Sequence, residues 1–226
     1  MTRGNRKEMT QMDTQQIQNP ELAEVKVELD RGAFLVKGAL AAGAIYGSLA
    51  VGPWVRRALA QTGSSDADIL NFALTLEYLE SAFYEQGLKT AKLGPEQKSV
   101  AQEIGSNEKD HVGSLMGAIT DLGATPVEAP AVDFGNAVKS QSGFLKLAQT
   151  FEDTGVSAYN GAGPMLKSKA LLGVAGSIVQ VEARHAARIR LLNGESPAPA
   201  AFDSPLTKDE VLKAVQPFVK STNGGM

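Results

Sequence analysis

Residues 104–115 read IGSNEKDHVGSL, and residues 178–189 read IVQVEARHAARI. Each stretch contains a Glu-x-x-His unit, with an apolar residue four positions before the glutamate and another four positions after the histidine. Residues three and four apart lie on one face of a helix, so each glutamate and histidine continues an apolar stripe that we expect to be buried. The two units are Glu108 with His111 and Glu182 with His185.

These units account for every histidine in the chain, which contains only two. A carboxylate placed in an apolar core costs several kcal/mol unless it is paired or bound to a metal. Two buried carboxylate–imidazole pairs therefore indicate a cation shared between the two stretches.

Two more glutamates lie within apolar stripes of other predicted helices. Glu77 and Glu108 are 31 residues apart, and the midpoint of this interval falls beside a Gly-Pro turn. Glu152 and Glu182 are 30 residues apart, and their midpoint falls at Lys167, between two predicted helices. Residues equally distant from the turn of an antiparallel helical hairpin lie at the same depth. We therefore expect four carboxylates and two imidazoles at one level of a helical bundle.

Helix-breaking residues divide the chain from residue 66 onward. Pro95 is a favourable first residue of a helix, and the Pro- and Gly-containing stretch 123–141 has no helical period, so it is predicted to be a long connection. A Thr-Lys-Asp-Glu capping box opens a short last helix, and no strand is predicted. The fold class is all-α, with helices expected at 66–93, 95–122, 142–166, 168–192 and 207–220.

Composition excludes several classes of protein. The 226 residues carry 22 Lys+Arg and 25 Asp+Glu, a formal charge of −3, so a strongly basic nucleic-acid-binding protein is excluded. No cysteine is present, which excludes disulfide scaffolds, thiolate zinc sites and iron–sulfur clusters.

The first 60 residues differ from the rest. Residues 1–32 are polar and predicted to be a disordered leader, whereas 33–55 are apolar with Lys37 as the only charge, long enough to span a bilayer. A basic pair and a small-residue cleavage motif at 58–60 follow, and DRGAFLVK at 30–37 resembles a twin-arginine export signal. Segment 33–60 is thus an export signal, cleaved or retained, or a membrane anchor. A helix buried in the domain is disfavoured by four glycines and a proline.

Residues 66–193 resemble the ferritin-like superfamily of dinuclear metal–carboxylate bundles. The stretches NFALTLEYLESAFYEQGL, NEKDH, FEDTGVSAY and VEARH are most similar to the exported ferritin-like domain family, which includes plant desiccation-related proteins. Bacterioferritin, rubrerythrin and manganese catalase are more distantly similar. The resemblance implies a four-helix bundle with a long crossover between its second and third helices and two bound iron or manganese ions. It implies as metal ligands Glu77, Glu108, His111, Glu152, Glu182 and His185, with Glu108 and Glu182 bridging.

Three further residues have more than one interpretation. Glu80 lies near the same stripe as Glu77, and it is either an extra ligand of the rubrerythrin kind or a hydrogen-bonded or rim glutamate. Tyr84 and Tyr159 each follow a stripe glutamate by seven residues. They are interpreted as groups that support the ligands, as electron donors, or as ordinary core tyrosines.

The resemblance implies oxidase or peroxidase chemistry on oxygen or peroxide, related to oxidative stress, with metal ions and small oxidants as partners. The alternatives are a non-catalytic, desiccation-related or metal-buffering bundle and, less favoured, a ferritin cage. The bundle is assigned to 61–194, and a Pro/Ala linker with the last helix to 195–226. We expect an exported protein of the periplasm or cell envelope, with membrane contact through 33–55, and homo-oligomers remain open.

Overall fold

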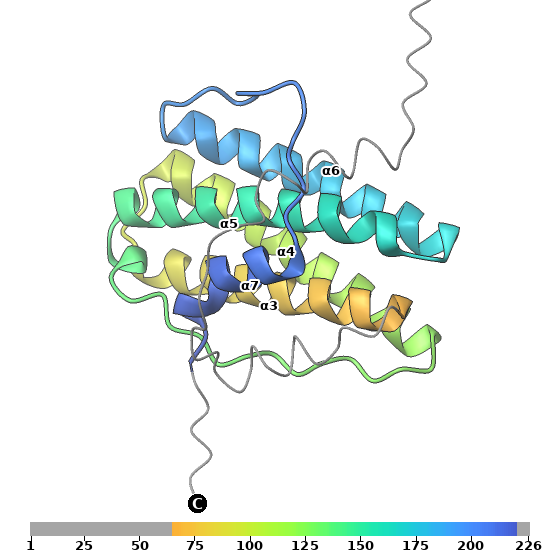
Figure 1. Ribbon diagram of the computed structural model, residues 1–226. Coiled ribbons are helices and arrows are strands. Elements are labelled where there is room, and N and C mark those ends of the chain that lie inside the picture. Colours follow the sequence, from red (N-terminus) through yellow and green to blue (C-terminus); the bar gives the residue numbers. More distant parts are fainter. Residues whose placement is uncertain (1–64, 221–226) are drawn as a thin grey trace, which may run out of the picture. The chain divides into compact units, whose positions relative to one another are not determined.

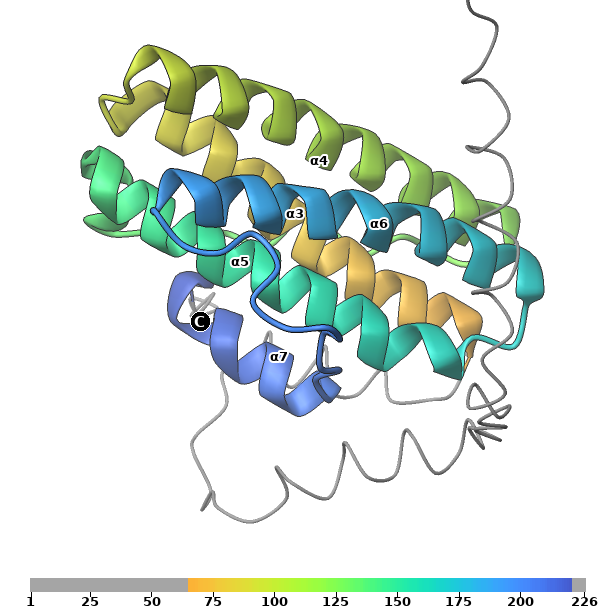
Figure 2. The same ribbon diagram turned by 90° about the horizontal axis from the view of Figure 1, so that it is seen from above.

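The computed structural model describes residues 65–220, and these residues form a bundle of four long helices (Figure 1). Helix α3 packs along α4, α5 packs along α6, and contacts of α3 with α5 and of α4 with α6 close the bundle (Figure 2). This arrangement confirms the predicted all-α class. The helices are α3 (Asp66–Thr90), α4 (Pro95–Asp121), α5 (Gln141–Ala162) and α6 (Lys169–Leu192).

The predicted leader at 1–32 and the predicted export or anchor segment at 33–60 lie outside the described residues. Among residues 65–220, none of the helices combines the length and the apolar character that crossing a membrane requires.

Serine side chains fix the beginnings of three long helices. The hydroxyl oxygens of Ser65, Ser140 and Ser168 accept hydrogen bonds from backbone N–H groups in the first turns of α3, α5 and α6. Helix α4 instead begins with Pro95, whose missing N–H group needs no partner at this position. These starts agree with the expected ones to within one residue.

Two helices are shorter than predicted because proline interrupts their last turns. Helix α5 ends at Ala162, and the 3₁₀ turn η2 (Gly163–Met165) contains Pro164. Helix α7 (Lys208–Val215) is followed by the 3₁₀ turn η3 (Gln216–Phe218), which contains a second proline. A proline ring clashes with the preceding helical turn and donates no hydrogen bond, so the tighter turn replaces the α-helix. The predicted capping box of α7 is present between Thr207 and Glu210.

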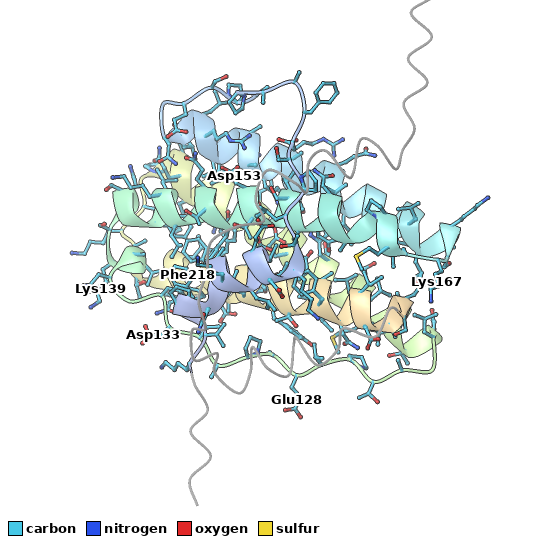
Figure 3. The ribbon with its side chains drawn as sticks, viewed as in Figure 1. Glu128, Asp133, Lys139, Asp153, Lys167 and Phe218 are labelled. Atoms are coloured by element: carbon cyan, nitrogen blue, oxygen red, sulfur yellow. The ribbon has the colours of Figure 1, made fainter. Side chains whose placement is uncertain are left out.

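The C-terminal segment, residues 205–220, packs on α5 and on the crossover that joins α4 to α5. The N–H of Leu206 donates a 3.0 Å hydrogen bond to the carbonyl of Ser157 on α5. Near the other end, the N–H of Asp133 donates to the carbonyl of Phe218 at 2.9 Å, and both residues are labelled in Figure 3. The crossover itself contains only a short 3₁₀ turn, η1 (Ala137–Lys139).

Two apolar clusters fill the bundle on either side of a polar layer. One cluster includes stacked Phe83 and Phe144, 4.8 Å between ring centroids, together with Val211 and Leu212 of α7. The other lies toward the opposite ends of the helices and includes Leu70, Leu74, Leu115, Ile119 and Ile178. The polar layer between them holds the glutamates and histidines singled out in the sequence.

Candidate metal centre

The structure brings all six predicted ligand residues together in the bundle interior. The four long helices each contribute a glutamate, and α4 and α6 each add a histidine three residues further on. The glutamates have no exposed surface, while His111 and His185 are 8% and 3% exposed. The level predicted from the turn midpoints is therefore the level at which these side chains meet: Glu77, Glu108, His111, Glu152, Glu182 and His185.

The ring of His111 faces three carboxylates through Nδ1. This nitrogen lies 3.3 Å from Glu77 Oε2, 3.2 Å from Glu108 Oε2 and 2.9 Å from Glu182 Oε1. One ligand atom from each of these four residues lies within 4.8 Å of the others, which is close enough for one cation to be shared among them.

The ring of His185 faces a second set of carboxylates. Its Nδ1 lies 2.9 Å from Glu108 Oε1, 3.4 Å from Glu152 Oε2 and 3.9 Å from Glu182 Oε2. These residues form a second group of the same kind, and the two imidazole centroids are 6.2 Å apart.

Glu108 and Glu182 belong to both groups. In each of them one carboxylate oxygen faces His111 and the other faces His185. Glu77 belongs only to the first group and Glu152 only to the second. The arrangement therefore consists of two adjacent positions, each with one imidazole and one glutamate of its own, joined by two shared carboxylates.

The buried atoms of this cluster lack partners that would balance their charge. Glu108 Oε1, Glu182 Oε2 and His185 Nδ1 form no hydrogen bond despite their short separations, and neither do Glu77 Oε2, Glu152 Oε2 and Glu182 Oε1. Within residues 65–220, no lysine or arginine forms an ion pair with these glutamates. The side chains therefore fit a pair of cations, which would satisfy the free oxygens and the negative charge together.

The pKa values of the cluster show the same need for positive charge. Burial raises the pKa of Glu77 to about 8, and burial likewise raises the pKa of Glu152 and Glu182. Burial alone would lower the pKa of His111, but its contacts with Glu108, Glu182 and Glu77 raise it to about 12. The metal-free chain thus retains protons among its carboxylates and on its imidazole.

Glu108 is the exception among the carboxylates. Burial opposes its ionisation, but the close approach of His111 and His185 outweighs burial and lowers its pKa to about 2. The pKa of His185, which burial would lower, is raised to about 10 by Glu108 and Glu152. Imidazolium protons therefore stand where cations would otherwise neutralise the shared carboxylate.

Both tyrosines of uncertain role contact predicted ligands. The hydroxyl of Tyr84 donates a hydrogen bond to Glu152, and the hydroxyl of Tyr159 donates one to Glu77. Each tyrosine thereby orients a glutamate that belongs to the other helical hairpin.

Glu80 is buried, with 3% of its surface exposed, and lies beside the cluster without belonging to either group. Its Oε1 and Glu182 Oε2 lie 3.1 and 3.4 Å from the place that a side-chain Cβ would occupy at Gly155. The absence of a side chain at Gly155 makes this approach possible. The exposed rim position considered for Glu80 is wrong, and its role as a ligand stays a prediction.

Asn107 is a contact that sequence reasoning missed. Its side-chain amide lies 3.0 Å from His185 Nε2, the ring nitrogen that faces away from the carboxylates. Asn107 directly precedes Glu108 on α4, whereas its partner is on α6. No spacing rule within one helix could have identified this pair.

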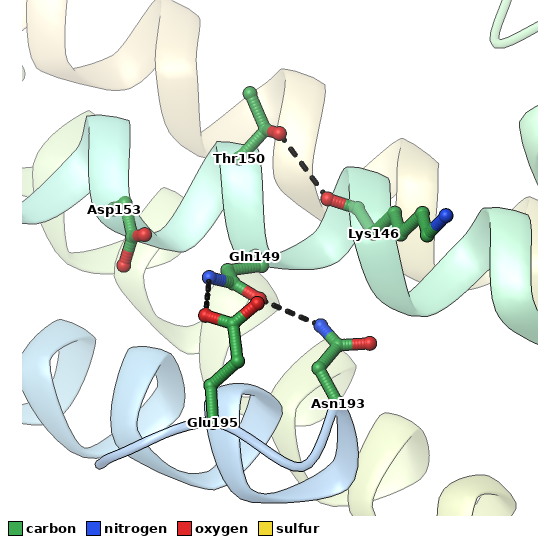
Figure 4. A pocket seen from close by; sticks show the side chains of 6 residues that line it. All are labelled: Lys146, Gln149, Thr150, Asp153, Asn193 and Glu195. Carbon is green, nitrogen blue, oxygen red and sulfur yellow. Dashed lines mark hydrogen bonds between the residues drawn. The ribbon is translucent and has the colours of Figure 1, made fainter.

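A separate surface pocket of about 390 Å³ lies between α5 and the end of α6 (Figure 4). Gln149 donates a 2.8 Å hydrogen bond to Glu195 and accepts one from Asn193 at 2.7 Å. These polar groups satisfy one another and hold the end of α6 against α5, and none of the six cluster residues lines this pocket.

The chain was compared with known proteins. Residues 65–195 match the family described as ferritin-like domain. A conserved hypothetical protein from Mycobacterium tuberculosis has a similar solved structure, with a TM-score of 0.54 and 20% sequence identity over 62% of this chain and 98% of that one. This likeness concerns the fold alone. No curated protein sequence matches the chain. The helical bundle and the family match over residues 65–195 together show that this chain belongs to the ferritin-like domain family.

Proposed function

We propose that this protein binds two iron or manganese ions at the buried cluster and uses them in oxidase or peroxidase chemistry. The observation that carries the proposal is the orientation of Glu108 and Glu182, each of which presents one oxygen to His111 and the other to His185. Two shared carboxylates between two imidazoles provide a complete set of donors for a pair of cations. Carboxylate-rich, imidazole-poor ligation favours iron or manganese.

A bound pair of such ions supplies two-electron chemistry with oxygen or peroxide. The chain's own residues would hold the ions at fixed separation, orient the outer carboxylates through Tyr84 and Tyr159, and exclude water with the apolar clusters on both sides. The only cavity that adjoins Glu80 among the described residues has a volume of about 10 Å³, room for about one water molecule. A small oxidant fits this interior better than a large organic substrate does.

The second candidate is a metal-buffering protein without turnover, of the desiccation-related kind. The complete burial of the four glutamates favours it, because a site closed to solvent retains its ions. We further propose that the protein acts outside the cytoplasmic membrane. The sequence of segment 33–60 supports this localisation, and fractionation of the native cells tests it.

Metal analysis of purified protein tests the proposed site. The wild-type chain should carry about two ions, and Glu182→Gln should lose both because it removes a shared ligand without changing side-chain size. Glu128→Gln changes an exposed residue and is the matched control, which should keep both ions. Retention of two ions by Glu182→Gln would contradict the site. Turnover of hydrogen peroxide by the loaded protein then separates the catalytic function from the buffering one.

A further inference from the structure

The two halves of the bundle are equivalent in their ligands. Helices α3 and α4 supply a glutamate, a tyrosine seven residues later and a Glu-x-x-His unit, and helices α5 and α6 supply the same set at the same spacings. Two positions around the cluster break this equivalence. Asn107 precedes the first Glu-x-x-His unit where Val181 precedes the second, and Glu80 corresponds to Gly155.

Asn107 fixes the ring of His185 only. When Nδ1 of a histidine faces a cation, the ring proton lies on Nε2 and needs an acceptor. The amide of Asn107 lies 3.0 Å from His185 Nε2, and its oxygen and nitrogen are interchangeable in such an assignment. No described residue makes a hydrogen bond to Nε2 of His111, and the corresponding Val181 side chain cannot make one.

Glu80 adds negative charge on the same half. Its Oε1 shares the space above Gly155 with Glu182 Oε2, and that oxygen of Glu182 is the one that faces His185. The opposite half has no counterpart, since its equivalent of Glu80 is Gly155 itself. Both asymmetries therefore strengthen the Glu152–His185 side.

We propose that the two metal positions are unequal: the position formed by Glu152 and His185 with the shared carboxylates fills first, and Asn107 is the positioning residue that makes it tighter. This inference rests on the proposed dinuclear function. Partners that hold a metal-binding histidine by its other ring nitrogen change metal affinity by about 10- to 100-fold, which is enough to separate two otherwise similar positions.

Titration of the full chain with Zn²⁺, a diamagnetic probe, tests the order of filling. The chain has two histidines, so a spectrum of ¹⁵N-labelled imidazoles reports each position separately. Below one equivalent of zinc, the Nδ1 resonance of His185 should shift while that of His111 does not, and the second equivalent should then shift His111. Simultaneous shifts, or a first shift at His111, would overturn the inference and leave the dinuclear site standing. Absence of any shift would instead refute the proposed function.

Three variants test the part played by Asn107. Asn107→Leu keeps the size of the side chain, removes the polar contact and should weaken the first zinc step about 10- to 100-fold with little change in the second. Asn107→Asp keeps an acceptor and should restore the tight step. Val181→Asn places an amide at the corresponding position of the other half, and it should tighten the second step and reduce the difference between the two. Equal effects of Asn107→Leu on both steps, or none, would show that Asn107 has no positioning role, and the Asp and Val181 variants decide the matter if the Leu variant does not fold.

Discussion

The hydroxyl of Tyr84 on α3 donates a hydrogen bond to the carboxylate of Glu152 on α5. Tyr159 on α5 returns the relationship by donating to Glu77 on α3. Each tyrosine follows its own hairpin's glutamate by two helical turns, so the bonds cross between the hairpins. The two halves of the bundle thereby orient one another's outer carboxylates, and the polar layer links them as firmly as the apolar clusters do.

Replacing either tyrosine by phenylalanine should therefore destabilise the protein. Tyr84→Phe or Tyr159→Phe leaves a buried carboxylate without its hydroxyl donor, at a cost of about 1–3 kcal/mol in the free energy of unfolding. Denaturant unfolding measures this cost. Tyr78→Phe is the control, because the exposed Tyr78 hydroxyl contacts only the sulfur of Met116 and its loss should change stability by less than about 0.5 kcal/mol. Equal losses in all three variants would contradict a special role for the crossed bonds.

The level of the cluster could be predicted from the sequence, and its lateral contacts could not. Helical spacing placed Glu108 beside His111, and the turn midpoints placed Glu77 opposite Glu108, because both depend only on the rise per residue. The pairing of Asn107 with His185 depends on how α4 is rotated against α6. Side-chain packing along the whole interface sets that rotation, and no local pattern encodes it.

The same limit applies to the C-terminal segment. Its capping box and approximate start were predictable from four consecutive residues. Its place against α5 was not, because the antiparallel bridge of Val132 with Val219 joins residues far apart in the chain. Prolines at 164 and 217 were visible in the sequence, yet only the structure shows that each α-helix has already ended before them.

The C-terminal segment crosses α5 so closely that only glycine fits at position 161. A Cβ at Gly161 would lie 2.0 Å from the carbonyl oxygen of Leu206, so Gly161→Ala should displace the segment and weaken the Leu206–Ser157 hydrogen bond. Overpacking of this kind costs about 1–3 kcal/mol. Amide exchange in α7 should accelerate. Gly113→Ala is the matched control on α4, where nothing lies within 4 Å, and it should stabilise the protein by about 0.5–1 kcal/mol. Unchanged exchange in Gly161→Ala would contradict the close packing.

A chain beginning at Gln61 should fold and bind metal. Both apolar clusters and all six cluster residues lie within residues 65–220, and Ser65 already caps the first helix. Circular dichroism should show a helical protein with a cooperative thermal transition, and metal analysis should give the same stoichiometry as for the full chain. Aggregation that is reversed by restoring residues 33–60 would show that this segment belongs to the core.

The stability of the metal-free protein should fall as the pH rises from about 5 to 8. A carboxyl group with a raised pKa in the folded state contributes stability below its unfolded pKa and loses it as the pH rises through the raised value, which is about 8 for Glu77. Glu182, raised by burial and the charges of Glu77 and Glu108, adds to the same loss, whereas the lowered pKa of Glu108, about 2, matters only below this range. His111, with a pKa of about 12, begins to lose its contribution above its ordinary value and reinforces the trend. Thermal melts with chelator should show a loss of about 1 kcal/mol or more, equivalent to about 2–4 °C per kcal/mol at this chain length. Bound metal should abolish the trend because it favours the ionised carboxylates, and Glu182→Gln should reduce it while Glu128→Gln leaves it unchanged. Coincident melts with and without metal at every pH would mean that these glutamates do not act together on a cation.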